Sequence, residues 1–342
     1  REECMMDLNI LWFILIVVLF TGFFFLEGFD YGVGGLMPFL SSDEKERGEI
    51  LRTITPVWDG NEVWMITAGG AMFAAFPHVY ATMFSAFYLA LFLMLVALIL
   101  RGVAFDLRTR QESLCWQRFW DGAICFGSIV PAFLWGVAVT DLIAGLPINE
   151  KMIYMGGFFD LLTPYSVIGG LAFLFVFLYH GASFLTIRLA KDSLILRCQE
   201  VGLKVGVIAA IFFVLCMVLT LQYTDLFTKP VAAVALFGAA LFFVIALLSM
   251  KLGKGRASFL LSAVAIVATT VAFFAGLFPR LMVSSINPAF SLTITNASSS
   301  PYTLSVMTVA AGIFVPIVLI YQAWSYYIFR KRVTPKDAEE HY

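Results

Sequence analysis

Charged residues are scarce in this sequence of 342 residues. They make up 13% of it, and hydrophobic residues make up 61%, with a mean hydropathy of +0.91. A soluble globular protein usually carries about 25% charged residues, so this chain has too few polar residues to cover a water-soluble domain. Apolar runs recur at about 20 residues, the length of a helix that crosses a bilayer. We therefore expect an all-α polytopic membrane protein.

Histidine and cysteine are also scarce, and basic residues show no surplus. The five cysteines are scattered without a CxxC pair or a Cys/His cluster, which argues against a zinc site or a disulfide framework. The net charge of −1 gives no basic surface for nucleic acid. Of the three histidines, His78 and His180 fall toward opposite membrane faces and cannot hold one haem between them. Haem ligation by one histidine and one methionine remains an alternative, but with 13 methionines such a pairing is a weak signal. We therefore expect this chain to ligate no metal or cofactor.

Apolar runs between polar breaks predict nine transmembrane helices joined by short connections. The predicted spans are 9–39, 57–76, 79–100, 119–140, 164–187, 203–223, 230–250, 257–279 and 304–328. No connection is long enough to hold a soluble catalytic domain. Any chemistry is therefore expected inside the bundle or at its edges.

The lysines and arginines predict the orientation of these helices. With nine spans, eighteen of the 22 fall on one side: Lys45, Arg47, Arg52, Arg101, Arg108, Arg110, Arg118, Arg188, Lys191, Arg197, Lys204, Lys251, Lys254, Arg256, Arg330, Lys331, Arg332 and Lys336. The other side has only Arg1, Lys151, Lys229 and Arg280. Because cytoplasmic loops are rich in Lys and Arg, the N-terminus is expected outside and the C-terminus in the cytoplasm.

Acidic residues within the predicted spans gather in the first half of the chain. The spans after residue 163 contain no Asp or Glu. The first half places six acids toward the predicted cytoplasmic ends of its helices: Glu27, Asp30, Asp59, Glu62, Asp106 and Asp121. An ionisable side chain at a membrane helix centre costs at least about 2.5–3.5 kcal/mol on insertion scales, so such residues usually serve a function.

Two of these helices repeat one spacing. Glu27 and Asp30 share one helix face, about 4.5 Å apart along the axis, and Asp59 and Glu62 have the same separation. Because the two helices run in opposite directions, each presents one deep and one shallow carboxyl. A carboxyl in a low-dielectric environment can take up and release a proton, so this stagger predicts a proton relay from the cytoplasm.

Simpler structural roles remain open for some of these acids. Asp59 follows Pro56 and could cap the first turn of its helix. Asp106 could form an interfacial ion pair with Arg101 or a neighbouring arginine, and Asp121 beside Arg118 is expected to be interfacial. Glu27 and Glu62 lie too far from the helix ends to act as caps. Close glycines in the same region favour tight helix packing.

Several segments resemble one known family. Residues 28–34 (GFDYGVG) and 56–64 (PVWDGNEVW), the latter running on into residues 66–71, resemble signatures of subunit II of cytochrome bd-type quinol oxidases. Residues 101–106 (RGVAFD), 127–128, 135–138 and 278–307 are also similar to that family. The resemblance extends from about residue 8 to 332. Nine spans with an outside N-terminus agree with it independently.

The resemblance implies a fold and a site. The fold would be two four-helix bundles, at 1–140 and 164–279, with external loops at 141–163 and 280–303 and a peripheral helix and tail at 304–342. Asp59 and Asp106 match positions proposed to pass protons toward the oxygen-reducing haem, and Trp64 matches a position near a proposed oxygen route. Glu27 and Asp30 match an acidic pair of the family. The connection between the sixth and seventh spans is shorter than in some relatives.

The resemblance also implies partners. The haem-bearing subunit I would carry two b-type haems and one d-type haem, and quinol would be the substrate. A small single-helix accessory subunit, membrane lipids and quinone are further expected partners, in the cell membrane of a bacterium or archaeon. Two other functions stay open: a proton-coupled secondary transporter and a purely structural membrane subunit. The second half lacks the acids and broken helices that transporters often repeat.

Overall fold

The computed structural model describes residues 2–334 and is built almost entirely of helices. The helices are α1 (Glu2–Leu40), α2 (Glu44–Arg52), α3 (Trp58–Ala75), α4 (Pro77–Ala86), α5 (Tyr88–Leu107), α6 (Leu114–Ala144), α7 (Pro164–Arg188), α8 (Asp192–Tyr223), α9 (Pro230–Lys251), α10 (Gly255–Leu277) and α11 (Pro301–Ile328). Two short antiparallel strands, β1 (Arg280–Met282) and β2 (Leu292–Thr293), precede α11. Arg1 and Lys336, used in the charge analysis, and the rest of the tail lie outside the described residues.

Eight of the described helices are long and apolar enough to cross a membrane. They are α1, α5, α6, α7, α8, α9, α10 and α11. The helix α3 occupies the position of the second predicted span but is not among the eight, because Asp59, Asn61 and Glu62 in its first two turns make it too polar. The all-helical membrane fold is thus confirmed in its coarse form.

The helix boundaries differ from the sequence-based expectation at several points, and α5 continues past the predicted end at residue 100 to Leu107. The third predicted span, 79–100, is two helices, α4 and α5, that meet at Phe87. Two other helices begin early, α6 at Leu114 and α8 at Asp192, so that Arg118, Arg197 and Lys204 lie on helices and not in loops. These polar stretches are rich in Leu, Gln, Arg, Lys and Glu, which favour helix, so the helices continue beyond their apolar segments.

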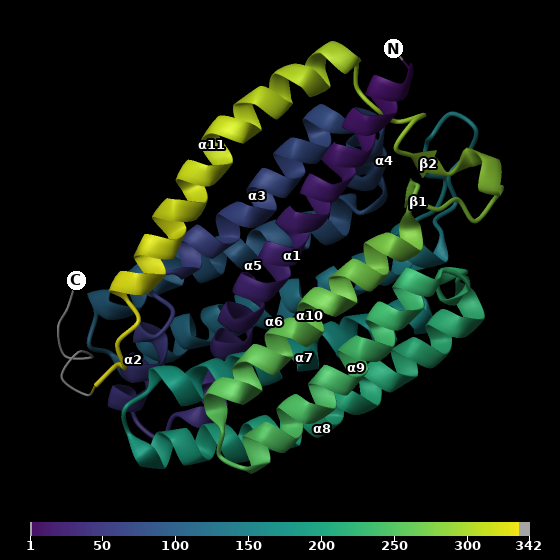
Figure 1. Cartoon of the computed structure of the whole chain (residues 1–342). Helices are drawn as coiled ribbons and strands as arrows, with labels where there is room; N and C mark the ends of the chain where they lie inside the picture. The colour runs from purple at the N-terminus through teal and green to yellow at the C-terminus, as the bar shows by residue number, and fades with distance from the viewer. Residues whose placement is uncertain (1, 335–342) are drawn as a thin grey trace.

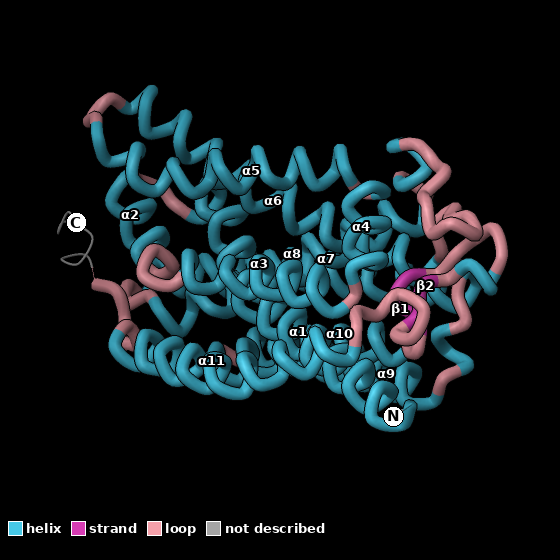
Figure 2. Tube along the Cα trace, turned by 90° about the horizontal axis from the view of Figure 1, so that it is seen from above, coloured by secondary structure: helices cyan, strands magenta, loops and turns pink. Residues whose placement is uncertain are grey.

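The long helices run side by side, and α1 lies among them (Figure 1). It packs against α3, α6, α7 and α10. The helix α11 lies along the outside against α1 and α3, and most of its surface is exposed. Figure 2 shows α5 and α6 on one side of the molecule and α11 on the other. The start of α1 and the end of α11 lie at opposite ends (Figure 1).

Close backbone contact joins α1 to α7. A Cβ atom at Gly32 would lie 2.0 Å from the carbonyl oxygen of Phe177, and one at Gly181 would lie 2.4 Å from the carbonyl carbon of Gly32. Lipid chains are as apolar as the side chains, so helices in a membrane associate mainly through such close packing. The expectation of tight glycine packing in this region is therefore correct.

Two loops cover the end of the molecule opposite α2. The segment after α6 contacts the segment that holds β1 and β2 (Figure 1). The Leu146 amide donates to the Val283 carbonyl at 2.9 Å, and the Ser284 hydroxyl donates to the Ile148 carbonyl at 2.7 Å. The two loops expected to be external therefore form one layer over the helix ends.

At the α2 end, an ionic contact ties the first half of the chain to the second. The buried Glu46 of α2 accepts hydrogen bonds from Lys191 at 2.9 Å and Arg197 at 2.7 Å, and from the Ser42 amide at 2.8 Å. Burial by itself would raise the pKa of Glu46, but these donors outweigh it and lower the pKa to about 2. Arg197 also donates to the Leu40 carbonyl at 2.5 Å, which fixes the turn after α1.

Replacing Glu46 with Gln should destabilise this contact. The change removes the charged acceptor of two cations, and we expect the free energy of unfolding to fall by about 2 kcal/mol. Because the folded pKa is lowered from 4.5 to about 2, the carboxylate stabilises the fold fully above pH 4.5, and this contribution is lost as the pH falls toward 2. The measurement is thermal unfolding of the purified protein between pH 5.5 and 8.

Glu200→Gln, at an exposed acid on α8, is the matched control and should leave stability unchanged. Equal melting temperatures for the Glu46→Gln variant and the parent protein would contradict the assigned role. A difference that varied between pH 5.5 and 8 would contradict the low pKa.

Candidate functional site

The acids predicted on the first two spans meet around one arginine of α5. Arg101 is fully buried, and its Nη1 atom donates to both Glu27 of α1 and Glu62 of α3. The distance to Glu62 Oε1 is 3.0 Å. Glu27 is fully buried, and the side chain of Glu62 is 18% exposed. The two deep carboxyls of the predicted stagger therefore share one guanidinium, and Arg101 forms its ion pairs inside the protein and not at the interface.

Aromatic rings pack around the guanidinium, and a glycine lets a neighbouring helix pack against Arg101. Its carbon lies 5.0 Å from the centre of the Tyr31 ring and 6.0 Å from those of Trp58 and Phe105, within the range of cation–π attraction. On the neighbouring α6, a Cβ atom at Gly127 would lie 2.5 Å from the Arg101 Cβ. Only glycine lets α6 approach this closely, so α6 packs directly against Arg101.

A hydrogen-bond chain through Asn61 connects the site to α11. The Asn61 amide donates to Asp30 Oδ2 at 2.6 Å, and its oxygen accepts from the Tyr326 hydroxyl at 2.7 Å. Gln322 also donates to this oxygen at 3.4 Å and accepts from the Trp64 indole at 2.8 Å. Asp30, like Glu27, is fully buried.

Two other predicted site residues, Asp59 and Asp106, lie at the α2 end of the same helices. Both are exposed, and neither forms an ion pair within residues 2–334. Their neighbours Trp58 and Phe105 stack at 4.9 Å, which holds the first turn of α3 against the last turn of α5. The expected alternative for Asp106, an ion pair with Arg101, Arg108 or Arg110, is therefore not found in the described chain.

The buried cluster has more acid than base. Three carboxyls, on Glu27, Asp30 and Glu62, face the single guanidinium of Arg101. Burying an uncompensated charge is costly, so such a cluster favours the uptake of protons. Glu27 Oε2, Asp30 Oδ1 and the Nε and Nη2 atoms of Arg101 have no hydrogen-bond partner among the described residues. The site can thus bind protons and has polar atoms that can bond to water.

Asp121 differs from its prediction. It is buried, and it pairs with Arg108 at 2.6 Å and with Arg47 at 3.2 Å, not with Arg118. Arg108 also pairs with Glu44 of α2. The sequence could not indicate this arrangement, because α2 folds back over the end of α6 and brings Arg47 to Asp121.

Three polar residues of the site were not predicted. Asn61 lies within residues 56–64, the run that carries the family resemblance, but a neutral amide between Asp59 and Glu62 was not singled out as a site residue. Gln322 and Tyr326 are four residues apart on α11 and so lie on one face of a helix. That spacing of polar groups on an apolar helix is the sequence signal that could have found them.

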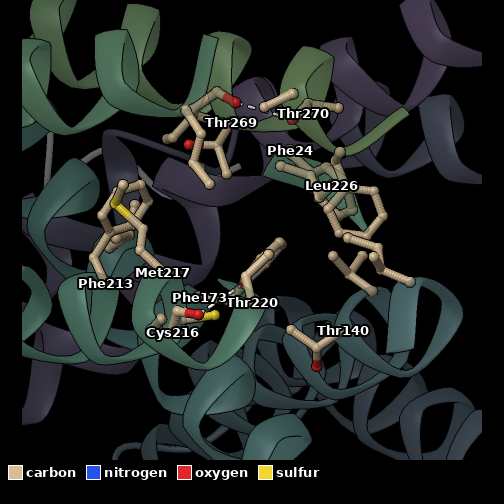
Figure 3. Close-up of a pocket in the computed structure, with 18 of the residues that line it drawn as sticks. Phe24, Thr140, Phe173, Phe213, Cys216, Met217, Thr220, Leu226, Thr269 and Thr270 are labelled. Atoms are coloured by element: carbon tan, nitrogen blue, oxygen red, sulfur yellow. Dashed lines mark hydrogen bonds between the residues drawn. The ribbon is translucent and has the colours of Figure 1, made fainter. Parts of the chain in front are cut away.

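An apolar cavity lies between α1, α6, α7, α8 and α10, separate from the carboxyl cluster. Figure 3 shows Phe24, Phe173 and Phe213 among the side chains around it. Its threonines do not make it polar, because Thr140, Thr220, Thr269 and Thr270 each donate to a carbonyl of their own helix. None of the predicted site residues lines it.

No cluster of three or more His, Cys, Asp or Glu residues in the described part of the chain could hold a metal ion. His180 is fully buried. Its Nδ1 atom lies 2.7 Å from the Ser262 hydroxyl, and its ring stacks on Phe259 with the centroids 4.6 Å apart. This contact with a neighbouring helix agrees with a structural role for His180.

Comparisons with known proteins agree with the resemblance found in the sequence. Residues 8–329 match the family described as cytochrome bd terminal oxidase subunit II. The chain is 40% identical over 339 residues to cytochrome bd ubiquinol oxidase subunit 2 of Bacillus subtilis, covering 97% of this chain and 99% of that protein. It is 34% identical over 368 residues to cytochrome bd-I ubiquinol oxidase subunit 2 of Escherichia coli K12, covering 97% of each.

A solved structure supports the fold. The bd oxidase of Geobacillus thermodenitrificans contains a chain that matches with a TM-score of 0.75 and 18% identity, over 95% of this chain and 100% of that one. At this identity the match speaks for the fold alone, whereas the family match and the identities above 30% cover nearly the whole sequence. The chain therefore belongs to the cytochrome bd terminal oxidase subunit II family.

Proposed function

We propose that this chain conducts protons from the cytoplasm toward the oxygen-reducing site of its partner subunit, through the carboxyls around Arg101. As a member of its family, it is a multi-pass cell-membrane subunit of a bd-type quinol oxidase. Such an oxidase passes electrons from quinol to O2, and each O2 takes up four electrons and four protons to give two waters. A path that supplies protons to this reaction needs groups that bind and release them.

One observation carries the proposal: one buried guanidinium bonds to two carboxyls from two helices, and a third buried carboxyl, that of Asp30, lies one turn from Glu27. Exposure falls along the expected path, from Asp59 and Asp106 at the surface, through the half-buried Glu62, to the fully buried Glu27 and Asp30. This order is what proton uptake at the α2 end requires. Water bonded to the unpartnered oxygens of Glu27 and Asp30 would complete the path.

The proposed direction depends on the orientation in the membrane. We propose nine crossings, with α3 counted as the second and with α4 and α5 forming the third. The α2 end then faces the cytoplasm, and the layer formed by the two loops faces outside. The lysines and arginines support this orientation, since those of α2, of the α7–α8 connection and of the start of α10 all belong to one end.

Membership of the family implies a partner, subunit I. We propose that subunit I carries the two b-type haems and the d-type haem and that quinol reacts there. The surroundings of His180 do not fit a haem, because Phe25, Phe29 and Phe259 pack around its fully buried ring. A small accessory subunit and bound quinone are further proposals that follow from the family resemblance.

We also propose that Trp64 lies beside the route that O2 takes, as the resemblance implies. Its indole donates to Gln322 of α11, and its ring covers Gly22 of α1, where a Cβ atom would lie 2.3 Å from the ring. Trp64 therefore closes the contact between α1, α3 and α11. A proton-coupled transporter is less well supported, because the relatives above 30% identity are oxidase subunits.

Replacing Asp59 with Asn should slow oxygen reduction more than it lowers haem content. The amide keeps the size of the side chain but cannot carry a proton, so quinol-dependent oxygen uptake should fall about tenfold or more. The measurement is oxygen uptake by the purified complex, divided by the haem content read from its visible spectrum. Asp106→Asn should act in the same direction.

Glu112→Gln is the matched control, because Glu112 is an exposed acid at the same end of the molecule. It should leave the rate per haem unchanged. Normal turnover of the Asp59→Asn and Asp106→Asn variants would favour a purely structural role for these acids.

Replacing Arg101 with Leu should separate the structural role of the cluster from conduction. The change leaves Glu27 buried without a cation, and removing one partner of a buried ion pair costs about 3–5 kcal/mol. We expect a lower melting temperature and less assembled complex. Adding Glu27→Gln should restore part of that stability, because it removes the fully buried carboxylate that bonded directly to Arg101, but the rate per haem should stay low.

The readouts are the melting temperature, the haem content and the oxygen uptake of each variant. A double variant that regained both stability and full turnover would show that Glu27 takes no part in conduction. Equal stability of the parent protein and the Arg101→Leu variant would contradict the assigned ion pair.

A further inference from the structure

A groove runs along the outer face of α6, away from the carboxyl cluster. It is lined by Pro38, Arg47, Arg118, Asp121, Gly122, Cys125, Phe126, Ile129 and Val130. Seven of these residues lie on α6 at spacings of three or four, so they form one stripe along its surface. Pro38 at the end of α1 and Arg47 of α2 form the rest of the wall, at the end of the groove where the arginines lie.

The groove has the length of one leaflet of a bilayer. Between Arg118 and Val130 the helix rises by about 18 Å. Half of the hydrocarbon core of a bilayer is about 15 Å thick. A groove of this length, with charge at one end and apolar side chains along the rest, matches one lipid with its headgroup at the membrane surface.

The rim of the groove is positively charged. Arg118 is exposed and forms no hydrogen bond or ion pair through its side chain with another residue of the described chain. Beside it, Arg47 and Arg108 face Glu44 and Asp121, and these four charges balance. Asp121 does not repel an anion strongly, because both of its oxygens accept from arginines. The rim therefore has one unbalanced positive charge, that of Arg118.

Below the rim the groove offers space and apolar surface. A Cβ atom added to Gly122 would meet nothing within 4 Å, and the ring of Phe126 is 41% exposed. Ile129 and Val130 are half-buried. The Cys125 thiol lies 3.6 Å from the Gly35 carbonyl of α1, so its polar contact is with the protein and not with the groove. This surface suits an acyl chain and offers few partners to a polar segment of protein.

We propose that this groove binds an anionic phospholipid of the cytoplasmic leaflet. Arg118 would pair with its phosphate, helped by Arg47, and one acyl chain would lie along Gly122, Phe126 and Val130. The cytoplasmic leaflet holds the anionic lipids that basic residues at the membrane surface attract. The choice of leaflet rests on the proposed orientation, whereas the binding itself does not.

Native mass spectrometry of the purified complex with its partner subunit tests the proposal. The complex is stripped of lipid and titrated with phosphatidylglycerol and, separately, with phosphatidylcholine. The parent complex should bind one phosphatidylglycerol more tightly than phosphatidylcholine. Arg118→Gln should weaken that phosphatidylglycerol about fivefold and reduce the preference. Gly122→Leu should weaken both lipids, because it fills the space for the acyl chain.

Two control variants separate this site from general effects. Arg256→Gln removes an exposed cation at the same end, and Gly238→Leu fills open space at another helix glycine. Both should bind lipid as the parent complex does. All variants should keep the haem content and the oxygen uptake measured in detergent, which shows that they are folded and that the conduction path is intact.

Equal affinity of the parent and the Arg118→Gln complexes for phosphatidylglycerol would overturn the proposal. A photo-reactive benzoylphenylalanine in place of Phe126 gives an independent test in membranes that contain phosphatidylglycerol. An adduct with the mass of that lipid is expected. An adduct with the partner subunit would mean that protein covers the groove, and it would also overturn the proposal.

Discussion

The ion pairs of Arg101 hold together the part of this membrane protein on which its proposed function depends. A guanidinium of α5, fully buried in the bundle, binds carboxyls from α1 and α3 at once. A buried charge without a partner costs several kcal/mol, so the three helices must stay in one arrangement for the charges to remain paired. Gly127 lets α6 pack directly against the arginine, and the Tyr31 ring lies over it. The same contact therefore fixes the fold and places the acids.

The cluster is suited to moving protons because its charges do not balance. A matched pair of one acid and one base would be a purely structural contact. Here Glu27 and Glu62 share one guanidinium, the buried Asp30 adds a third carboxyl, and Asn61 and Tyr326 extend the network from Asp30 to α11. In the proposed function, Asp59 and Asp106 take up protons at the surface and this cluster passes them inward. The family to which the chain belongs gives that path a destination, the oxygen-reducing site of the partner subunit.

Polar contacts at the α2 end serve other purposes. Glu46 binds Lys191 and Arg197 across the two halves of the chain, and Asp121 binds Arg108 and Arg47 beneath α2. In both contacts one carboxylate is bonded to two cations, which fits a role in holding the helices in place. Arg118 is different, because its charge faces outward over an apolar groove. The proposed lipid would place its phosphate at this unbalanced charge.

The sequence by itself determined the solvent, the helical class and the family. Its hydropathy requires lipid, its cations predict one orientation, and the runs at residues 28–34 and 56–64 point to the oxidase subunit. Helical spacing also predicted that Glu27 and Asp30 lie on one face of their helix and that Asp59 and Glu62 lie on one face of theirs. Only the tertiary structure decided that Glu27 and Glu62 meet at Arg101, that Asp121 is buried, and that Gln322 and Tyr326 join the site. Periodicity describes which side of one helix a residue lies on, but the partner of a buried charge depends on how separate helices pack.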